Sequence, residues 1–299
     1  MDGNGQNVTR LTNQAGYDTW PTWSPDGSLI LFTSARDTGQ NFYCMTMKDL
    51  RIKRITYTQS PNLPGVWSPD GRSIAYASGI SGAETEIYLS DTNGNKLTRL
   101  TTNGQPDYAP AWSPDGSLLA FYSGKTLLNQ IYLMSNSGVN QTRITDSPFG
   151  SVNPQWNPEG DKLAFVRFTR ELGLRSELCL MSADGSNQTK LLVHNDIYHT
   201  VSFVWSPYGD FLVSSKMDSA HLQIYKTNIT TLASTNLSNS DADDTAPTCS
   251  PDGQWIAFVS TRDGNKEIYV MRNNGSELMR LTQNSSVDDF PVFSHTIYK

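Results

Sequence analysis

Four aspartates recur at one position of a repeated sequence, five residues before a tryptophan or its replacement. They are Asp18, Asp107, Asp244 and Asp288, and the other copies have Asn62, Ser151 and Thr200 at this position. Carboxylates gathered around one opening would attract a cation or a basic segment of a partner, because a cleft lined by one sign of charge focuses the electric field. The alternative is that each aspartate caps its own turn, as aspartate commonly does.

A second candidate is the loop in which the repeat breaks step, between residues 192 and 199. Histidine, aspartate and histidine within six residues could bind a metal ion. Loop histidines are usually plain polar residues, however, and the repeat fixes no matching acid or histidine elsewhere, so no metal site is predicted. Since loops on a rigid scaffold carry binding, this loop is predicted to contact a partner through His194, Asp196, Tyr198 and His199.

No catalytic residue is predicted. The sequence has no Gly-x-Ser-x-Gly or His-Glu-x-x-His motif. Gly124-Lys125-Thr126 resembles the end of a phosphate-binding loop, but Leu119 stands where that loop requires glycine. No cofactor is predicted either, and a divalent cation in a central channel is the alternative left open.

The elements that position these residues are given by a repeat. Trp23-Ser24-Pro25-Asp26-Gly27 returns at residues 67–71 and 112–116, with weaker copies at 156–160, 205–209 and 249–253. The steps between copies are 44, 45, 44, 49 and 44 residues. A fixed period of this size is typical of a repeat architecture. A residue that recurs once per period is therefore structural first, and departures from the repeat are the stronger functional candidates.

Each period contains four short apolar runs separated by turns. In the last complete copy the runs are 246–249, 255–260, 267–271 and 278–282. Short β-branched and aromatic runs bounded by Gly, Pro, Asn and Asp predict strands joined by hairpins. No window has sustained helical periodicity, so little helix is expected. Four antiparallel strands in about 40–45 residues make a blade of a β-propeller. First strands line the axis of a propeller, which places the four aspartates near one mouth of its channel.

The chain ends are expected to close this propeller. Residues 1–12 resemble the tail of a repeat and residues 288–294 the head of one. We therefore predict a single all-β domain over residues 1–299, with seven four-stranded blades, the last a short composite of both ends that removes free sheet edges. Six blades with two unpaired end strands is the alternative.

The pattern resembles the repeat of TolB-type propellers. Pro-x-Trp-Ser-Pro-Asp-Gly is followed by Ile-Ala-Phe-x-Ser, Arg-Asp-Gly-x-x-x-Ile-Tyr-x-Met and Arg-Leu-Thr, over nearly the whole chain. The resemblance implies the fold and leaves the activity open. Similar repeats occur in periplasmic TolB, which binds envelope proteins, in propeller domains of prolyl-oligopeptidase-like peptidases, and in metal-dependent oligogalacturonate lyases. It favours a periplasmic or extracellular location, although no signal peptide is visible.

Composition narrows the classes of partner. The net charge of −6 argues against nucleic acid, and no apolar run is long enough for a membrane span. The three cysteines are an odd number in apolar positions, so they are expected to be buried thiols rather than disulfides. The leading interpretation is a non-catalytic scaffold that presents a rim and the channel mouth to another protein or a peptide segment. The alternative is a propeller enzyme, or a substrate-gating domain, that acts on polysaccharide or peptide.

Overall fold

The chain folds into β-strands joined by turns. The computed structural model describes residues 1–37, 39–57, 63–79, 85–124, 128–170, 175–194 and 202–294. No helix occurs among these residues, which confirms the expectation from the sequence.

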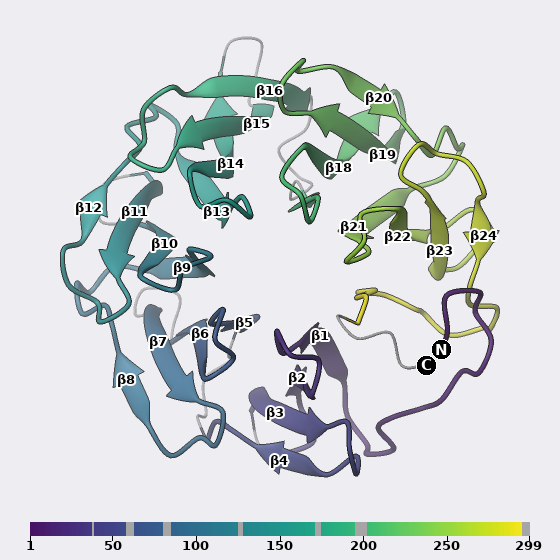
Figure 1. The fold of residues 1–299 in the computed structure, drawn as a ribbon, viewed down its shortest axis with the longest axis horizontal. Helices are drawn as coiled ribbons and strands as arrows, with labels where there is room; N and C mark the ends of the chain where they lie inside the picture. Colours follow the sequence, from purple (N-terminus) through teal and green to yellow (C-terminus); the bar gives the residue numbers. More distant parts are fainter. Residues whose placement is uncertain are drawn as a thin grey trace. The chain divides into compact units, whose positions relative to one another are not determined.

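Within the described ranges, twenty-four strands form six sheets of four, and in each sheet the strands lie in sequence order (Figure 1). Each sheet is a propeller blade that corresponds to one period of the sequence. Blades 1 to 3 contain β1 (Asp18–Trp23), β2 (Leu29–Ser34), β3 (Asn41–Thr46) and β4 (Ile52–Arg54); β5 (Val66–Trp67), β6 (Ser73–Ser78), β7 (Glu86–Asp91) and β8 (Leu97–Arg99); and β9 (Asp107–Trp112), β10 (Leu118–Ser123), β11 (Gln130–Ser135) and β12 (Thr142–Arg143). Blades 4 to 6 contain β13 (Ser151–Trp156), β14 (Lys162–Thr169), β15 (Arg175–Ser182) and β16 (Thr189–His194); β17 (Phe203–Trp205), β18 (Phe211–Asp218), β19 (His221–Asn228) and β20 (Ser234–Asn236); and β21 (Asp244–Cys249), β22 (Trp255–Ser260), β23 (Glu267–Arg272) and β24 (Met279–Arg280).

The prediction of seven blades is wrong, because the described residues form six. Residues 1–11 and 283–294 contain no strand. The N-terminal turn does pack beside blade 6, where Gly5 lies against the backbone of Leu281 much as Gly275 lies against Leu237. Neither terminal segment is part of a sheet among the described residues. Residues 295–299 lie outside them.

The chain divides into two compact units. The C-terminal unit comprises Met1–Leu11, Glu171–Leu178 and Lys190–Ser294, and therefore holds blades 5 and 6. The N-terminal unit consists mainly of Thr12–Arg170 and Cys179–Thr189, and holds blades 1 to 3 and most of blade 4. A single domain over residues 1–299 stays a prediction.

The Ser-Pro-Asp-Gly segments form the predicted turns. In the first copy, Gly27 N donates to Ser24 O at 2.8 Å, which closes a four-residue turn around Pro25 and Asp26. The Ser24 hydroxyl donates to Asp26 Oδ1 at 2.6 Å and accepts from Leu29 N at 2.9 Å, so one side chain joins the turn to the next strand. Hydrogen bonds from Ser24 and Ser28 lower the pKa of Asp26, with the Ser24 hydroxyl as the largest cause. The same serine–aspartate pair recurs in the turns at 68–71, 113–116 and 250–253.

The tryptophan before the turn packs against the neighbouring blade in two copies. Trp67 of blade 2 joins a cluster with Leu31 and Phe42 of blade 1, and its indole Nε1 donates to Thr22 O at 3.3 Å. Trp156 likewise donates to Ala111 O of blade 3 at 3.2 Å. Trp67, Trp156 and Trp205 are buried, whereas Trp23 and Trp112 are partly buried.

All three cysteines are free thiols, as expected. Cys44 and Cys179 are buried, and Cys249 is partly buried at the position where other blades have tryptophan. Burial raises the pKa of the Cys44 and Cys249 thiols to about 12, so they behave as small apolar side chains.

Candidate functional site

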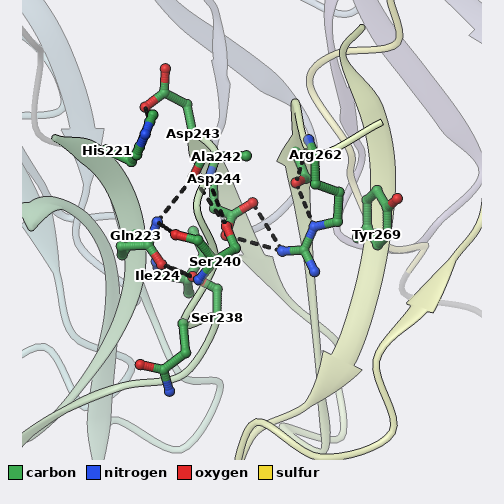
Figure 2. A network of polar contacts seen from close by, with 12 residues as sticks. His221, Gln223, Ile224, Ser238, Ser240, Ala242, Asp243, Asp244, Arg262 and Tyr269 are labelled. Carbon is green, nitrogen blue, oxygen red and sulfur yellow. Dashed lines mark hydrogen bonds and ion pairs between the residues drawn. The ribbon is translucent and has the colours of Figure 1, made fainter. Parts of the chain in front are cut away.

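Arg262 joins the first strand of blade 6 to the end of the second (Figure 2). Its Nη2 lies 3.1 Å from both carboxylate oxygens of Asp244, and its Nε donates to Ser260 Oγ at 2.8 Å. The side chain of Asp244 is fully buried, and the guanidinium carbon lies 4.7 Å from the centre of the Tyr269 ring. A planar guanidinium can pair with a carboxylate and stack on a ring at the same time. Asp244 is therefore neutralised within its own blade.

Blade 1 contains the same cluster in a more exposed form. Arg36 Nη2 lies 3.1 and 3.0 Å from the Asp18 oxygens, and Arg36 Nε donates to Ser34 Oγ at 2.8 Å. The guanidinium carbon again lies 4.7 Å from a ring centre, that of Tyr43. The side chain of Asp18 is 18% exposed where that of Asp244 is 0% exposed. The two clusters thus compare a partly exposed with a buried carboxylate, while the arginine is 11% exposed in blade 1 and 19% exposed in blade 6.

A tyrosine extends each cluster outward. The Tyr43 hydroxyl donates to Asp37, whose carboxylate is also 3.2 Å from Arg54 Nη1. Burial, and then the hydrogen bond to Asp37, raise the pKa of Tyr43 to about 12. The phenol therefore stays a donor throughout the physiological range. The matching residues of blade 6 are Tyr269, Asp263 and Arg280.

A polar side chain at or near the start of the third strand holds the loop that follows the blade, as Glu267 does in blade 6. Glu267 accepts from Thr282 Oγ1 at 2.6 Å, from Arg280 Nη2 at 3.0 Å and from Asn284 N at 3.1 Å. Burial alone would raise the pKa of Glu267, but the hydrogen bonds, led by that from Thr282, outweigh it and lower the pKa to about 2. The matching residues in other blades are Asn41, Glu86, Gln130, Glu177 and Gln223.

In blade 5 this position is Gln223, and its amide organises the loop before Asp244 (Figure 2). Gln223 Nε2 donates to Ser240 O and Ala242 O, each at 2.9 Å, and Gln223 Oε1 accepts from Ser240 N at 2.8 Å. The adjacent Asp243 accepts from Leu222 N at 2.9 Å and lies 3.5 Å from His221 Nδ1. Both side chains of the His221–Asp243 pair are nearly half exposed.

Asp107 differs from Asp18 and Asp244 because it lies close to a second acid. It is fully buried at the start of β9 and accepts from Asn103 Nδ2 at 2.6 Å. Burial raises the pKa of Asp107, and the charge of Glu86 adds to the rise, although hydrogen bonds from Ser123, Thr101 and Asn103 oppose it.

The four predicted aspartates thus occupy separate settings. Asp288, in the segment after blade 6, accepts from Asn284 Nδ2 at 2.6 Å. Asp107, Asp244 and Asp288 each accept from a side chain four residues earlier, as loop caps do: Asn103, Ser240 and Asn284. Among the described residues, no hydrogen bond or ion pair joins two of the four. Asp18 and Asp107 belong to one unit and Asp244 and Asp288 to the other, so a site shared by all four stays a prediction.

The predicted partner loop falls mostly outside the described residues. His194 ends β16, and its side chain is not among those described. Asp196, Tyr198 and His199 lie outside the described ranges altogether. Their role as a contact loop stays a prediction.

Two exposed tyrosines flank the blade 1 cluster and were missed in the sequence. Tyr17 and Tyr57 are 82% and 73% exposed. The Tyr17 carbonyl accepts from Ala35 N at 3.0 Å, and Gly16 packs closely against the Ala35 backbone, so this loop is fixed. The Tyr57 ring lies 4.6 Å from the Arg54 guanidinium carbon. A sequence signal existed, because blade 6 has Asp243 and Gln283 at the matching positions.

The described part of the chain contains no group of three or more His, Cys, Asp and Glu side chains arranged to hold a metal ion. Nor does it contain a helix long and apolar enough to cross a membrane.

Six repeated four-stranded blades define the chain as a β-propeller. A model of the TolB β-propeller domain matches residues 1–85, 64–171 and 162–296. The chain belongs to the TolB β-propeller domain family.

Relatives in sequence match only short stretches. An uncharacterized protein of Agrobacterium fabrum is 33% identical over 87 residues, which is 29% of this chain and 30% of the relative. The Tol-Pal system protein TolB of Bordetella pertussis is 46% identical over 41 residues, 14% of this chain and 9% of the relative. The matched stretches thus span less than a third of either relative.

Solved structures share the fold over most of the chain. An oligogalacturonate lyase in complex with manganese has a TM-score of 0.72 at 18% identity and covers 93% of this chain and 81% of its own. TolB from Acinetobacter baumannii has a TM-score of 0.57 at 18% identity, with 91% and 69% covered. A puromycin hydrolase has a TM-score of 0.70 at 13% identity, with 90% and 47% covered. TolB, a lyase and a hydrolase all have this fold, so the fold does not select the function.

Proposed function

We propose that the chain is a non-catalytic protein-binding scaffold, a TolB-like propeller that presents one rim and its channel mouth to a partner protein. Both compact units are proposed to act as one propeller domain over residues 1–299. The observation that carries the proposal is the pair of exposed tyrosines, Tyr17 and Tyr57, on the fixed end of blade 1.

Tyrosine and arginine are the residue types that dominate the energy of protein interfaces. A tyrosine has few rotatable bonds and a large surface, so it loses little entropy on binding. Here Tyr57 stacks with Arg54, and Arg54 is fixed by Asp37. The Asp18–Arg36 pair and the hydrogen bond from Ala35 N to Tyr17 O hold the start of β1, next to Tyr17, against the end of β2. In this proposal the repeated acids position the loops, and the tyrosines make the contact.

The pull-down that tests the proposal uses two matched variants. The first carries Tyr17→Ser and Tyr57→Ser. The control carries Leu97→Ser and Val139→Ser, whose side chains are 59% and 55% exposed elsewhere in the same unit. We expect one protein from envelope and soluble extracts of the source cells to be retained by the wild type and the control and lost by the tyrosine variant. Retention by all three forms would refute the blade 1 contact.

An activity screen tests the enzyme alternative. Oligogalacturonate and amino-acid amide substrates, each with and without added divalent ions, are expected to remain uncleaved. Turnover of either substrate that disappears with His194→Ala plus His199→Ala would replace the scaffold function with a propeller enzyme.

A further inference from the structure

In one turn of the repeat an aromatic residue occupies the position of the usual aspartate, and an acid two residues later takes over its hydrogen bond. In the turns with Asp26, Asp70, Asp115 and Asp252, the carboxylate accepts from the serine hydroxyl at the start of the turn. In the turn at 206–209 this position is Tyr208. Asp210 accepts from Ser206 Oγ instead, at 2.6 Å, and Gly209 N still donates to Ser206 O at 3.1 Å. The turn therefore forms without a contribution from the Tyr208 side chain.

Tyr208 is nevertheless held in place. A Cβ added to Gly253 of blade 6 would stand 3.3 Å from Tyr208 Cε2 and 3.4 Å from its Cδ2, so one edge of the ring packs on that glycine. Pro207 Cγ packs on the same glycine. The residue still exposes 65% of its surface. An aromatic ring fixed at one edge and open to solvent is already in the arrangement that binding requires.

The surroundings of this ring carry negative charge. Asp210 follows it in the same turn, and Asp252 precedes the glycine on which it packs. Hydrogen bonds from Ser250 and Gln254, with Ser250 the largest cause, lower the pKa of Asp252 and keep it ionised. The cations of this region already have partners: the Lys226 ammonium donates to Asn273 O at 3.1 Å and lies 4.2 Å from the centre of the Phe211 ring. Arg272, whose charge also lowers the pKa of Asp252, pairs with Glu277 at 3.2 Å.

We propose that the Tyr208 turn is a second binding site, which takes an arginine or lysine side chain from a basic segment of a partner protein. The cation would lie on the open face of the ring, and the carboxylates of Asp210 and Asp252 would complement its charge. An electron-rich ring beside acids favours a cation over a neutral or acidic group. This proposal does not use the blade 1 tyrosines, so the test of one site can fail without affecting the test of the other.

The test uses a fluorescein-labelled peptide with three arginines separated by glycines, and a control peptide with glutamate in place of arginine. Binding is measured by fluorescence anisotropy at low ionic strength for the wild type, Tyr208→Phe, Tyr208→Leu and Tyr208→Asp. The aspartate variant is informative because it restores the residue of the sister turns and adds negative charge. In this variant, loss of the ring should weaken binding of the arginine peptide, whereas the added negative charge should strengthen it.

We expect the arginine peptide to bind the wild type and Tyr208→Phe alike, and Tyr208→Leu and Tyr208→Asp roughly two- to fivefold more weakly. Equal or tighter binding by Tyr208→Asp would show that only general acidity attracts the peptide, and would overturn the proposal. So would equal binding of the arginine and glutamate peptides to the wild type. Melting temperatures check that the variants fold, and if Tyr208→Asp does not fold, Tyr208→Leu decides the outcome alone.

Discussion

Removing the arginine from the blade 6 cluster should destabilise the protein far more than removing the matching arginine from blade 1. Arg262→Ala leaves the Asp244 carboxylate, which is fully buried, with Ser240 Oγ as its remaining hydrogen-bond donor among the described residues. Breaking a buried ion pair by deleting one partner costs about 3–5 kcal/mol, because an uncompensated charge remains. Arg36→Ala leaves Asp18, which is 18% exposed and can be hydrated, so we expect roughly half that loss or less.

Urea denaturation of the wild type and both single variants measures the difference, with tryptophan fluorescence as the signal. A third variant, Arg262→Ala with Asp244→Asn, removes the stranded charge and should recover part of the loss. Equal losses for Arg262→Ala and Arg36→Ala would show that burial of the carboxylate does not set the cost. A double variant no more stable than Arg262→Ala alone would contradict the role assigned to the charge.

Three further predictions concern the blade contacts and the turns. Trp156→Ala should cost about 3–5 kcal/mol in urea denaturation, as deletion of a buried aromatic does, and an unchanged midpoint would refute the packing role. Cys249→Trp should be destabilising alone and tolerated together with Lys226→Leu. Lys226 lies opposite Val213, at the place where other blades have the apolar residues Leu89, Leu133 and Val270. Additive effects of the two changes on stability would contradict this coupling. The pKa of Asp115 is lowered to about 2, with the Ser113 hydroxyl as the largest cause, so its contribution to stability is present above its unfolded pKa of about 4 and is lost as pH falls toward 2. Ser113→Ala should therefore lose more stability relative to the wild type at pH 6 than near pH 2, where only the lost bond from Leu118 N to Ser113 Oγ remains, and a difference that stays constant with pH would refute the assignment.

The repeat made the blades predictable because each turn and strand is specified by nearby residues. The first turn is fixed by hydrogen bonds of Ser24 within five residues. A tryptophan such as Trp67, which packs on the neighbouring blade, recurs before the turn of five blades. The number of blades was not predictable from residues 1–12 and 288–294. These segments have the sequence of strands, but a strand also needs a partner, which the local sequence does not report.

The site was predicted less well for a related reason. The aspartates and their period can be read in the sequence, but not the arginine that neutralises Asp18 or Asp244, which stands in the turn after the second strand of the same blade. Tyr17, Tyr57 and Tyr208 are departures from the repeat, and the rule that departures carry function could have found them. Their exposure became visible only when the loops were placed, because a tyrosine in a loop is as often packed as free.

The protein-binding function is tested most directly by cross-linking in the cells from which the chain comes. A photoreactive benzoylphenylalanine replaces Tyr17 in one form, Tyr57 in a second and Leu97 in a control. The scaffold function predicts that one and the same protein is cross-linked from positions 17 and 57 and not from position 97. Cross-linking that is absent from both tyrosine positions, or identical from all three, would contradict it.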